Sequence, residues 1–195
     1  MPGYNLAMNA VWLGIPDTIL AERHALGHDR RDELWEGVLH MVPSPWFQHN
    51  DFNFLLGGYL RRQASARGLV HGQDPMAVYA PDVDPESWRV PDISIARPDQ
   101  VSARGFEGAV LVVEVLSPHD ESRQKFDFFA RVGVQEVWII EPHTRAPEIY
   151  VRAGNDFVLA EPVAGIHRAP LLDITLEVVA GPWLRVTRGA DTTEI

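Results

Sequence analysis

The sequence predicts one α/β domain over residues 1–195, with N-terminal helices and a C-terminal β extension. Its 195 residues, 46% of them hydrophobic, are enough for one well-packed core. Apolar residues recur at helical spacing between residues 52 and 63, and short apolar runs typical of strands begin after Leu69. Residues 109–116 and 134–140 are two such runs with a helical pattern between them, which indicates parallel strands joined by a crossover helix.

The N-terminal part is expected to be an irregular arm followed by a helix. Residues 1–16 carry scattered Gly and Pro and are interpreted as the arm. Asp17 precedes apolar residues at helical spacing and is a suitable N-cap. His24 and His28 have the i, i+4 spacing of some metal ligands, but no Glu-x-x-His pattern accompanies them. A polar helix face is the favoured interpretation of this pair.

A hairpin is expected next. Residues 33–42 read as two short strands around a Glu36-Gly37 turn. A two-residue turn at this point would place Glu33 opposite His40. The hairpin therefore presents one carboxylate and one imidazole on neighbouring strands.

A long amphipathic helix follows the hairpin. Asn50 is a suitable cap for it and Gly68 a suitable stop. Its predicted inner face consists of Phe52, Leu55, Leu56, Tyr59, Leu60 and Gln63. Its basic cluster consists of Arg61, Arg62 and Arg67. A solvated helix end explains that cluster better than a DNA-contacting face.

The rest of the chain is expected to be rich in strands. They are predicted at residues 78–80, 89–96, 109–116, 134–140, 147–151 and 157–160, with one or two more towards Ile195. The run at 109–116 is apolar on both faces, as expected of a central strand. A helix is predicted at about 120–132, capped either by Ser117, with Pro118 in the first helical position, or by Asp120.

Composition limits the functional classes. The absence of cysteine excludes disulfides, thiolate zinc sites and Cys nucleophiles. The N-terminus lacks a signal-peptide pattern and no apolar run reaches membrane-spanning length, so a soluble cytoplasmic protein without a membrane partner is expected. The net charge of −10 argues against broad nonspecific binding to nucleic acid. Trp46, Phe47 and the final strands supply apolar surface for a homo-oligomer.

Three charged residues occupy positions where the fold should be dry. Asp92 follows Pro91 inside a predicted strand, and Glu114 interrupts the apolar central strand. Lys125 is the only lysine, the other 16 of the 17 basic residues being arginine. It shares a helix face with Phe129 at i, i+4 and can therefore reach over the end of the Glu114 strand.

Two carboxylates and an amine at a strand end suit phosphodiester hydrolysis. Carboxylate oxygens bind Mg²⁺, which supplies a usable water nucleophile and neutralises phosphate charge. An amine can orient or deprotonate that water, or stabilise the transition state. An internal salt bridge that only supports the structure explains the same residues equally well.

Several motifs also follow one another in an order that is specific as a set. They are Glu33-Leu34-Trp35-Glu36-Gly37, His49 before a helix, Val90-Pro91-Asp92-Ile93, Val113-Glu114-Val115-Leu116-Ser117-Pro118, Lys125 and residues 132–142. This set resembles the Uma-two family, bacterial proteins of restriction endonuclease-like fold in the PD-(D/E)xK nuclease superfamily. The resemblance runs from about Glu33 to Tyr150. It implies a mixed central sheet flanked by helices, and Mg²⁺- or Mn²⁺-dependent cleavage of nucleic acid, with DNA as the expected substrate.

The resemblance also implies roles for individual residues. Asp92 and Glu114 would be metal ligands, joined by the backbone carbonyl of Val115. The superfamily lysine usually lies two residues after the second acid, where this chain has Leu116. Lys125 matches the place where the Uma-two family carries that lysine on the following helix.

Glu33 would match an N-terminal acid that some superfamily members use to hold or orient the metal. Glu36 is a neighbouring competitor, but a position at the turn tip is a poorer place for a ligand. Phe129 stands where the family often has Tyr, which removes one hydroxyl from the implied site.

Other sites are weaker candidates. Ser117 lacks a Gly-x-Ser-x-Gly elbow, and no Gly-rich phosphate loop follows a strand. His49 and His119 could line the site, although surface or capping roles are favoured for both. The leading hypothesis is a Mg²⁺-dependent nuclease. The alternatives are a catalytically silent binding or assembly protein of the same fold and, more weakly, a metal hydrolase of a small phosphoester.

Overall fold

A computed structural model describes residues 10–12, 16–42, 45–80, 84–117, 120–181 and 183–195. Pro118 and His119 lie outside the described residues, as does most of the expected N-terminal arm. Within that arm, Ala10–Trp12 forms a strand, β1, which pairs with residues 39–41. No helix of the described residues is both long and apolar enough to cross a membrane.

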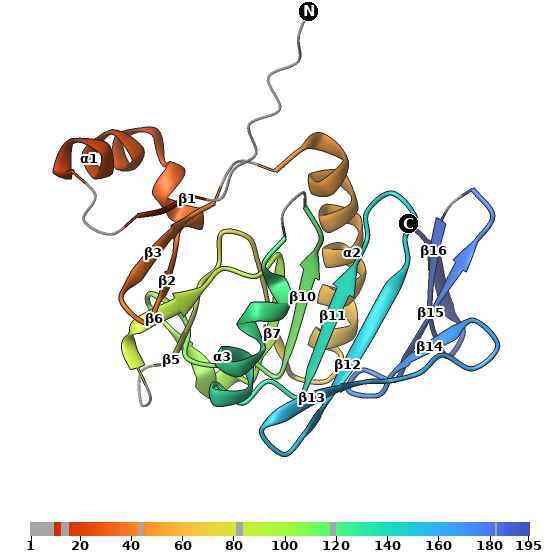
Figure 1. The fold of residues 1–195 in the computed structure, drawn as a ribbon. Helices are drawn as coiled ribbons and strands as arrows, with labels where there is room; N and C mark the ends of the chain where they lie inside the picture. Colours follow the sequence, from red (N-terminus) through yellow and green to blue (C-terminus); the bar gives the residue numbers. More distant parts are fainter. Residues whose placement is uncertain (1–9, 13–15, 43–44, 81–83, 118–119, 182) are drawn as a thin grey trace, which may run out of the picture.

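A mixed six-stranded sheet forms the centre of the fold, as predicted (Figure 1). Its order is β13-β12-β11-β10-β7-β4. The strands are β4 Val70–Gln73, β7 Ile93–Ala96, β10 Leu111–Val115, β11 Glu136–Ile140, β12 Pro147–Ala153 and β13 Asp156–Leu159. β10 and β11 are parallel, which confirms the predicted crossover, and all other neighbours are antiparallel.

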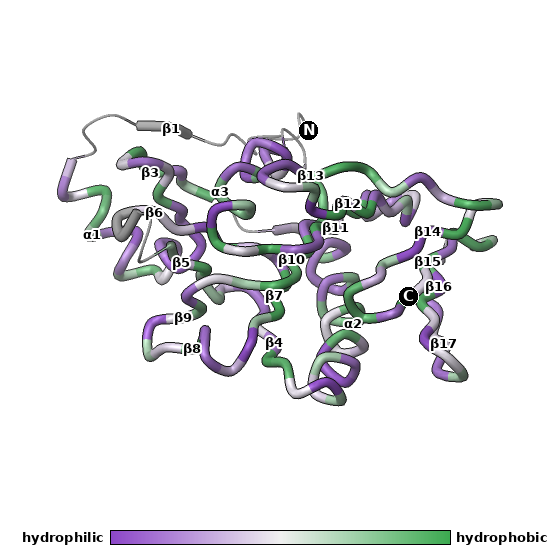
Figure 2. Tube along the Cα trace, turned by 90° about the horizontal axis from the view of Figure 1, so that it is seen from below, coloured by the Kyte–Doolittle hydropathy of each residue, from purple (hydrophilic) through white to green (hydrophobic). Residues whose placement is uncertain are grey.

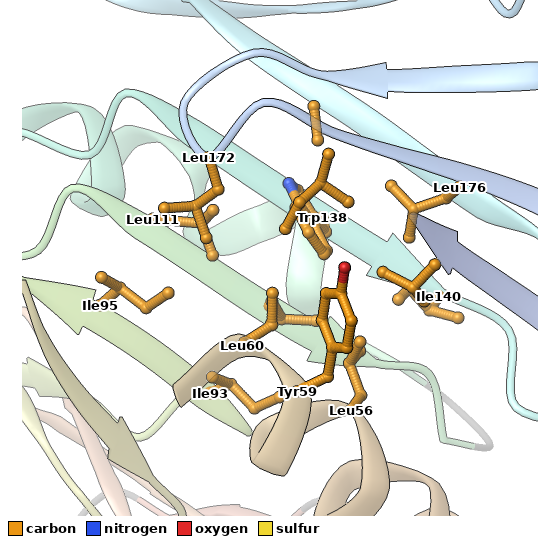
Figure 3. Packing of buried hydrophobic residues seen from close by; sticks show 14 of the residues in the cluster. Leu56, Tyr59, Leu60, Ile93, Ile95, Leu111, Trp138, Ile140, Leu172 and Leu176 are labelled. Atoms are coloured by element: carbon orange, nitrogen blue, oxygen red, sulfur yellow. The ribbon is translucent and has the colours of Figure 1, made fainter. Parts of the chain in front are cut away.

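Helices cover both faces of this sheet, and Figure 2 shows α2 and α3 on opposite sides of it. α2, Phe47–Ser65, packs Phe52, Leu56 and Leu60 against the alternate side chains of β7, β10 and β11 that point towards it. Figure 3 shows this core around Tyr59 and Trp138. α3, Phe126–Arg131, covers the other face after a 3-10 turn, η3, at Ser122–Lys125.

A second sheet carries the predicted hairpin. Its order is β1-β3-β2-β6-β5-β9-β8. Besides β1, the strands are β2 Glu33–Trp35, β3 Val38–Met41, β5 Val78–Ala80, β6 Asp84–Arg89, β8 Val101–Ser102 and β9 Gly105–Phe106. Glu33 pairs with His40, as predicted from the two-residue turn. Glu36 and Gly37 both have positive φ, at 47° and 83°, which is the geometry of a type I′ turn.

The C-terminal part forms a separate four-stranded sheet, where one or two strands were expected. The strands are β14 Ile166–Ala169, β15 Ile174–Val179, β16 Trp183–Arg188 and β17 Asp191–Glu194. Leu176 and Val186, which pair across β15 and β16, belong to the same core as α2. The sheet therefore extends the central core rather than forming one of its own.

The first two helices differ from the prediction in two boundaries and in one residue of the buried face. α1, Asp17–Leu26, includes Asp17 as its first residue, with Pro16 at the N-cap. α2 begins three residues before the predicted cap Asn50. Leu55 is 45% exposed, because it lies about 100° around the helix from buried Leu56 and falls outside the buried face.

The predicted strand at 89–96 is interrupted. β6 ends at Arg89 and β7 begins at Ile93. Pro91 has no N–H to donate to a ladder, so pairing stops around it. Asp92 consequently lies just before β7, at the end of the central sheet, and not inside a strand as predicted.

The helix predicted at 120–132 is also shorter. The Ser122 N–H donates to Asp120 Oδ1 at 2.7 Å, so Asp120 acts as the local turn-forming residue. One 3-10 turn follows before the α-helix begins at Phe126. Lys125 therefore projects from the 3-10 turn, close to the end of β10.

Candidate active site

An ion cluster joins three distant parts of the chain at the end of the central sheet. Lys125 Nζ donates to Glu33 Oε1 at 2.9 Å and to Glu114 Oε1 at 3.0 Å. Glu33 comes from strand β2, Glu114 from β10 and Lys125 from η3. All three residues are buried, with exposed fractions of 1%, 5% and 8%. The structure thus brings three of the predicted site residues into direct contact.

Backbone and indole groups fix the orientation of Glu33. Its Oε1 accepts the Val90 N–H at 2.8 Å, and its Oε2 accepts the Trp35 indole N–H at 2.7 Å. A buried carboxylate with this many donors is held in one rotamer. By contrast, Glu36 lies at the turn tip and pairs with Arg131 Nη2 at 2.5 Å. Glu33 is therefore the hairpin acid that belongs to the cluster.

Asp92 lies beside this cluster and is held by two other groups. Its Oδ2 accepts the Val115 N–H at 2.7 Å, one residue after Glu114. Its Oδ1 lies 2.7 Å from His49 Nε2. The break in the strand at Pro91 leaves the Asp92 side chain at the sheet end, where it can reach the neighbouring strand. Asp92 and His49 are both partly buried, with side-chain exposures of 14% and 12%.

Burial and charge act against each other on these groups. Burial alone would lower the pKa of Lys125, but attraction to Glu114 and Glu33 outweighs it and raises that pKa, so the amine is an ammonium at neutral pH. Burial raises the pKa of Glu114, and Lys125 only partly opposes this effect. Burial would also lower the pKa of His49, yet its hydrogen bond to Asp92 leaves that pKa raised.

A pocket of about 160 Å³ gives solvent access to these residues. Its lining includes Glu33, Asp92, Glu114, Val115, Lys125 and His49. Such a volume holds several water molecules, since one water needs roughly 10–15 Å³ measured in this way. Trp46 and His143 also line it, from the start of α2 and from the loop after β11. The cluster is therefore buried but not sealed.

This geometry can be compared with that of known proteins. A family model named Uma2 and described as "Putative restriction endonuclease" matches residues 20–186. The chain belongs to the Uma2 family. One solved structure of similar fold, from Anabaena variabilis, is titled as a putative nuclease belonging to DUF820; its TM-score is 0.58 at 15% identity, over 73% of this chain and 83% of that one. No curated protein matches the chain significantly.

The acid set of this Uma2 protein fits a hard divalent cation in its chemistry. Asp92 and Glu114 offer carboxylate oxygens to one pocket, and such oxygens are the ligands that Mg²⁺ and Mn²⁺ prefer. Among the residues that the structure describes, no three His, Asp or Glu side chains are grouped closely enough to hold a metal as they stand. In the arrangement described, Glu114 Oε1 accepts from Lys125 and Asp92 Oδ1 lies against His49.

The structure corrects the role expected for His49 and agrees that His24 and His28 do not bind a metal together. His49 does not cap a helix or lie on the surface; it contacts Asp92 and lines the pocket. Its spacing from buried Phe52 and Asn53, at i+3 and i+4, was the available signal for this inward position. The His24 and His28 pair does not form a metal site, because α1 ends between them and His24 Nδ1 lies 2.7 Å from Asp29.

Proposed function

We propose that this Uma2-family protein is a Mg²⁺- or Mn²⁺-dependent nuclease that hydrolyses phosphodiester bonds in nucleic acid, with DNA as the expected substrate. One observation carries the proposal: Lys125 bridges Glu33 and Glu114 in a pocket that Asp92 also lines. A lone surface ion pair would need no pocket. A purely structural cluster of Lys125 with Glu33 and Glu114 would not need a third carboxylate, Asp92, at the same sheet end.

A cation held by Asp92, Glu114 and the Val115 carbonyl would neutralise phosphate charge and lower the pKa of an attacking water. The residues of the chain supply the remaining functions. The Lys125 ammonium places a fixed positive charge at the pocket wall, where charge develops on the phosphodiester in the transition state. Because its pKa is raised, we assign it to charge stabilisation rather than to proton abstraction.

Two further side chains position the acids. Glu33 holds the Lys125 ammonium from the side opposite to Glu114, which limits the rotamers of that long side chain. His49 and the Val115 N–H hold the two oxygens of Asp92. Pre-organisation of this kind lowers the cost of reaching the reactive geometry.

A nuclease-fold binding or assembly protein that does not cut is the second candidate. The observation that favours it is the charge balance: the net charge is −10, and the ion cluster satisfies Lys125 without any cation. Calorimetric titration of the wild-type protein with Mn²⁺ separates the candidates. Heat of binding at the pocket is expected for the nuclease, and its absence would favour the silent protein.

Cleavage assays test the proposal directly. Plasmid, single-stranded DNA and RNA are incubated with the protein in Mg²⁺, Mn²⁺ or EDTA, beside Asp92→Ala and the control Asp99→Ala, whose side chain is 73% exposed. Cleavage of at least one substrate is expected from the wild type and the control, and none with EDTA or with Asp92→Ala. Cleavage that Asp92→Ala leaves intact would reject this site.

A further inference from the structure

The outer face of α2 is exposed and carries large aromatic side chains. Phe47 is 81% exposed and Phe54 is 72% exposed, although the opposite face of the same helix is part of the main core. In Figure 2, α2 lies at the margin of the fold, and none of the described chain lies beyond it. Exposed phenyl rings on one helix face are typical of an interaction surface.

The exposed residues along this face would pair favourably with the same residues of a second, antiparallel copy of the helix. From the N-terminal end the outer stripe reads Phe47, Asp51, Phe54, Gly58, Arg61 and Ser65, all exposed. Reversing the stripe places Phe54 opposite Gly58, Asp51 opposite Arg61 and Phe47 opposite Ser65. Each pair thus combines a large with a small residue or an acid with a base.

We propose that α2 binds the α2 of a second copy of this chain, antiparallel and across a two-fold axis near residue 56. A two-fold interface requires that residue i meets j while j meets i, and the outer stripe meets this condition at all three pairs. Gly58 has open space where a side chain would stand: apart from its own helical turn, no heavy atom of the residues that the structure describes lies within 4 Å of the Cβ position. That space accommodates the Phe54 ring of the partner copy.

Charge also favours a second copy over nucleic acid on this face. Asp51 at one end of the stripe would repel a phosphate backbone, whereas it attracts Arg61 of an antiparallel copy. Arg145 of the same chain lies within electrostatic range of Asp51 and offsets part of its charge, so the Asp51–Arg61 contact adds specificity more than strength. A contact between two single helices falls below roughly 1,200 Å², so a weak, concentration-dependent dimer is expected.

Sedimentation of the full chain tests the assembly. The wild type is expected to shift with concentration from 21.9 kDa towards twice that mass. Phe54→Ala should weaken the dimer at least about tenfold, since an aromatic anchor buried at the centre of an interface is a typical hot spot. Val158→Ala is the control, because Val158 is 57% exposed but lies on β13, away from the stripe. It should leave the dimer unchanged.

Charge reversal tests the pairing. Asp51→Arg and Arg61→Asp should each weaken the dimer, and the two changes in one chain should restore it, because every acid would again face a base. Single variants that dimerise as strongly as the wild type would overturn the assigned contacts, and so would a double variant that stays as weak as the single ones.

Disulfide cross-linking tests the antiparallel direction. Because the chain has no cysteine of its own, every disulfide must join introduced residues. Asp51→Cys and Arg61→Cys chains are oxidised alone and as a mixture. Residues 51 and 61 face each other in the antiparallel pair, so the mixture should cross-link readily. Like residues would lie about 15 Å apart along the helix axes, too far for a disulfide.

Three results would overturn the proposal. One is a monomer at every concentration tested, and another is a dimer that Phe54→Ala leaves intact. The third is cross-linking of like cysteines in preference to the mixture, which would indicate a parallel pair. If the monomer instead loses affinity for nucleic acid on Phe54→Ala, the stripe binds nucleic acid and the proposed dimer is wrong.

Discussion

At the scale of single residues, the candidate site is an arrangement of buried charge. Lys125 satisfies two carboxylates that come from different strands, and each acid is hydrogen-bonded or paired in turn. Breaking a buried pair leaves an uncompensated charge, which costs far more than the loss of a surface pair. The position of Lys125 between Glu33 and Glu114 therefore has a measurable structural consequence, whatever the reaction.

Replacement of Lys125 by methionine is expected to destabilise the fold by about 3–5 kcal/mol, because Glu33 and Glu114 would face each other without a cation. The control is Arg123→Met. It removes a pair to Glu148 whose side chains are 48% and 38% exposed, and it should cost less than about 1 kcal/mol. Urea unfolding measures both variants. Equal losses in the free energy of unfolding for the two variants would show that the buried cluster stabilises the fold no more than a surface pair does.

At the scale of elements, local periodicity predicted the parts of the fold that bury a continuous apolar face. α2 and the parallel pair β10 and β11 were predicted because their patterns are strong over a single stretch. β14 to β17 were predicted only as one or two strands: β15 and β16 alternate between buried and more exposed residues, but β14 and β17 are mostly exposed and lack an apolar face. The break before β7 was missed although Pro91, its physical cause, was visible in the sequence.

One element junction carries an acid that the sequence did not single out. Glu136 begins β11 and is buried; its Oε1 accepts the Trp138 indole N–H at 2.6 Å, and its Oε2 accepts the Leu171 N–H at 3.0 Å. Leu171 lies in the turn between β14 and β15, so this carboxylate connects the central sheet to the C-terminal sheet. Burial raises the pKa of Glu136 above the value of 4.5 expected in the unfolded chain.

This shift predicts a pH dependence of stability. Because the folded state binds the Glu136 proton more tightly, the contribution of this group to the free energy of unfolding is largest below pH 4.5 and falls as pH rises through the folded pKa. Glu136→Gln removes the titration, so the variant should gain stability relative to wild type between acid and neutral pH. Exposed Glu161→Gln is the control. Free energies of unfolding are measured in urea at several pH values. A difference between Glu136→Gln and wild type that stays constant with pH would contradict the prediction.

At the scale of the whole molecule, the site depends on contacts that no local pattern contains. The sequence singled out Asp92, Glu114 and Lys125 as misplaced charges, and the family resemblance added Glu33. The sequence did not place His49 in the pocket, because the contact that holds it there is with Asp92, 43 positions away. The chain is acidic overall, so the proposed nuclease function requires that affinity for a polyanion come from the pocket and a cation held there rather than from net charge.

The most direct test of the central claim is the rate of plasmid cleavage as a function of Mg²⁺ concentration. Wild type is measured beside Glu114→Gln, which keeps the shape of the side chain and removes its charge, and beside Glu161→Gln as the exposed control. Saturable Mg²⁺-dependent cleavage is expected for wild type and control, with a loss of at least about 100-fold in Glu114→Gln. Equal rates for Glu114→Gln and wild type would contradict the assignment of this pocket as the nuclease site.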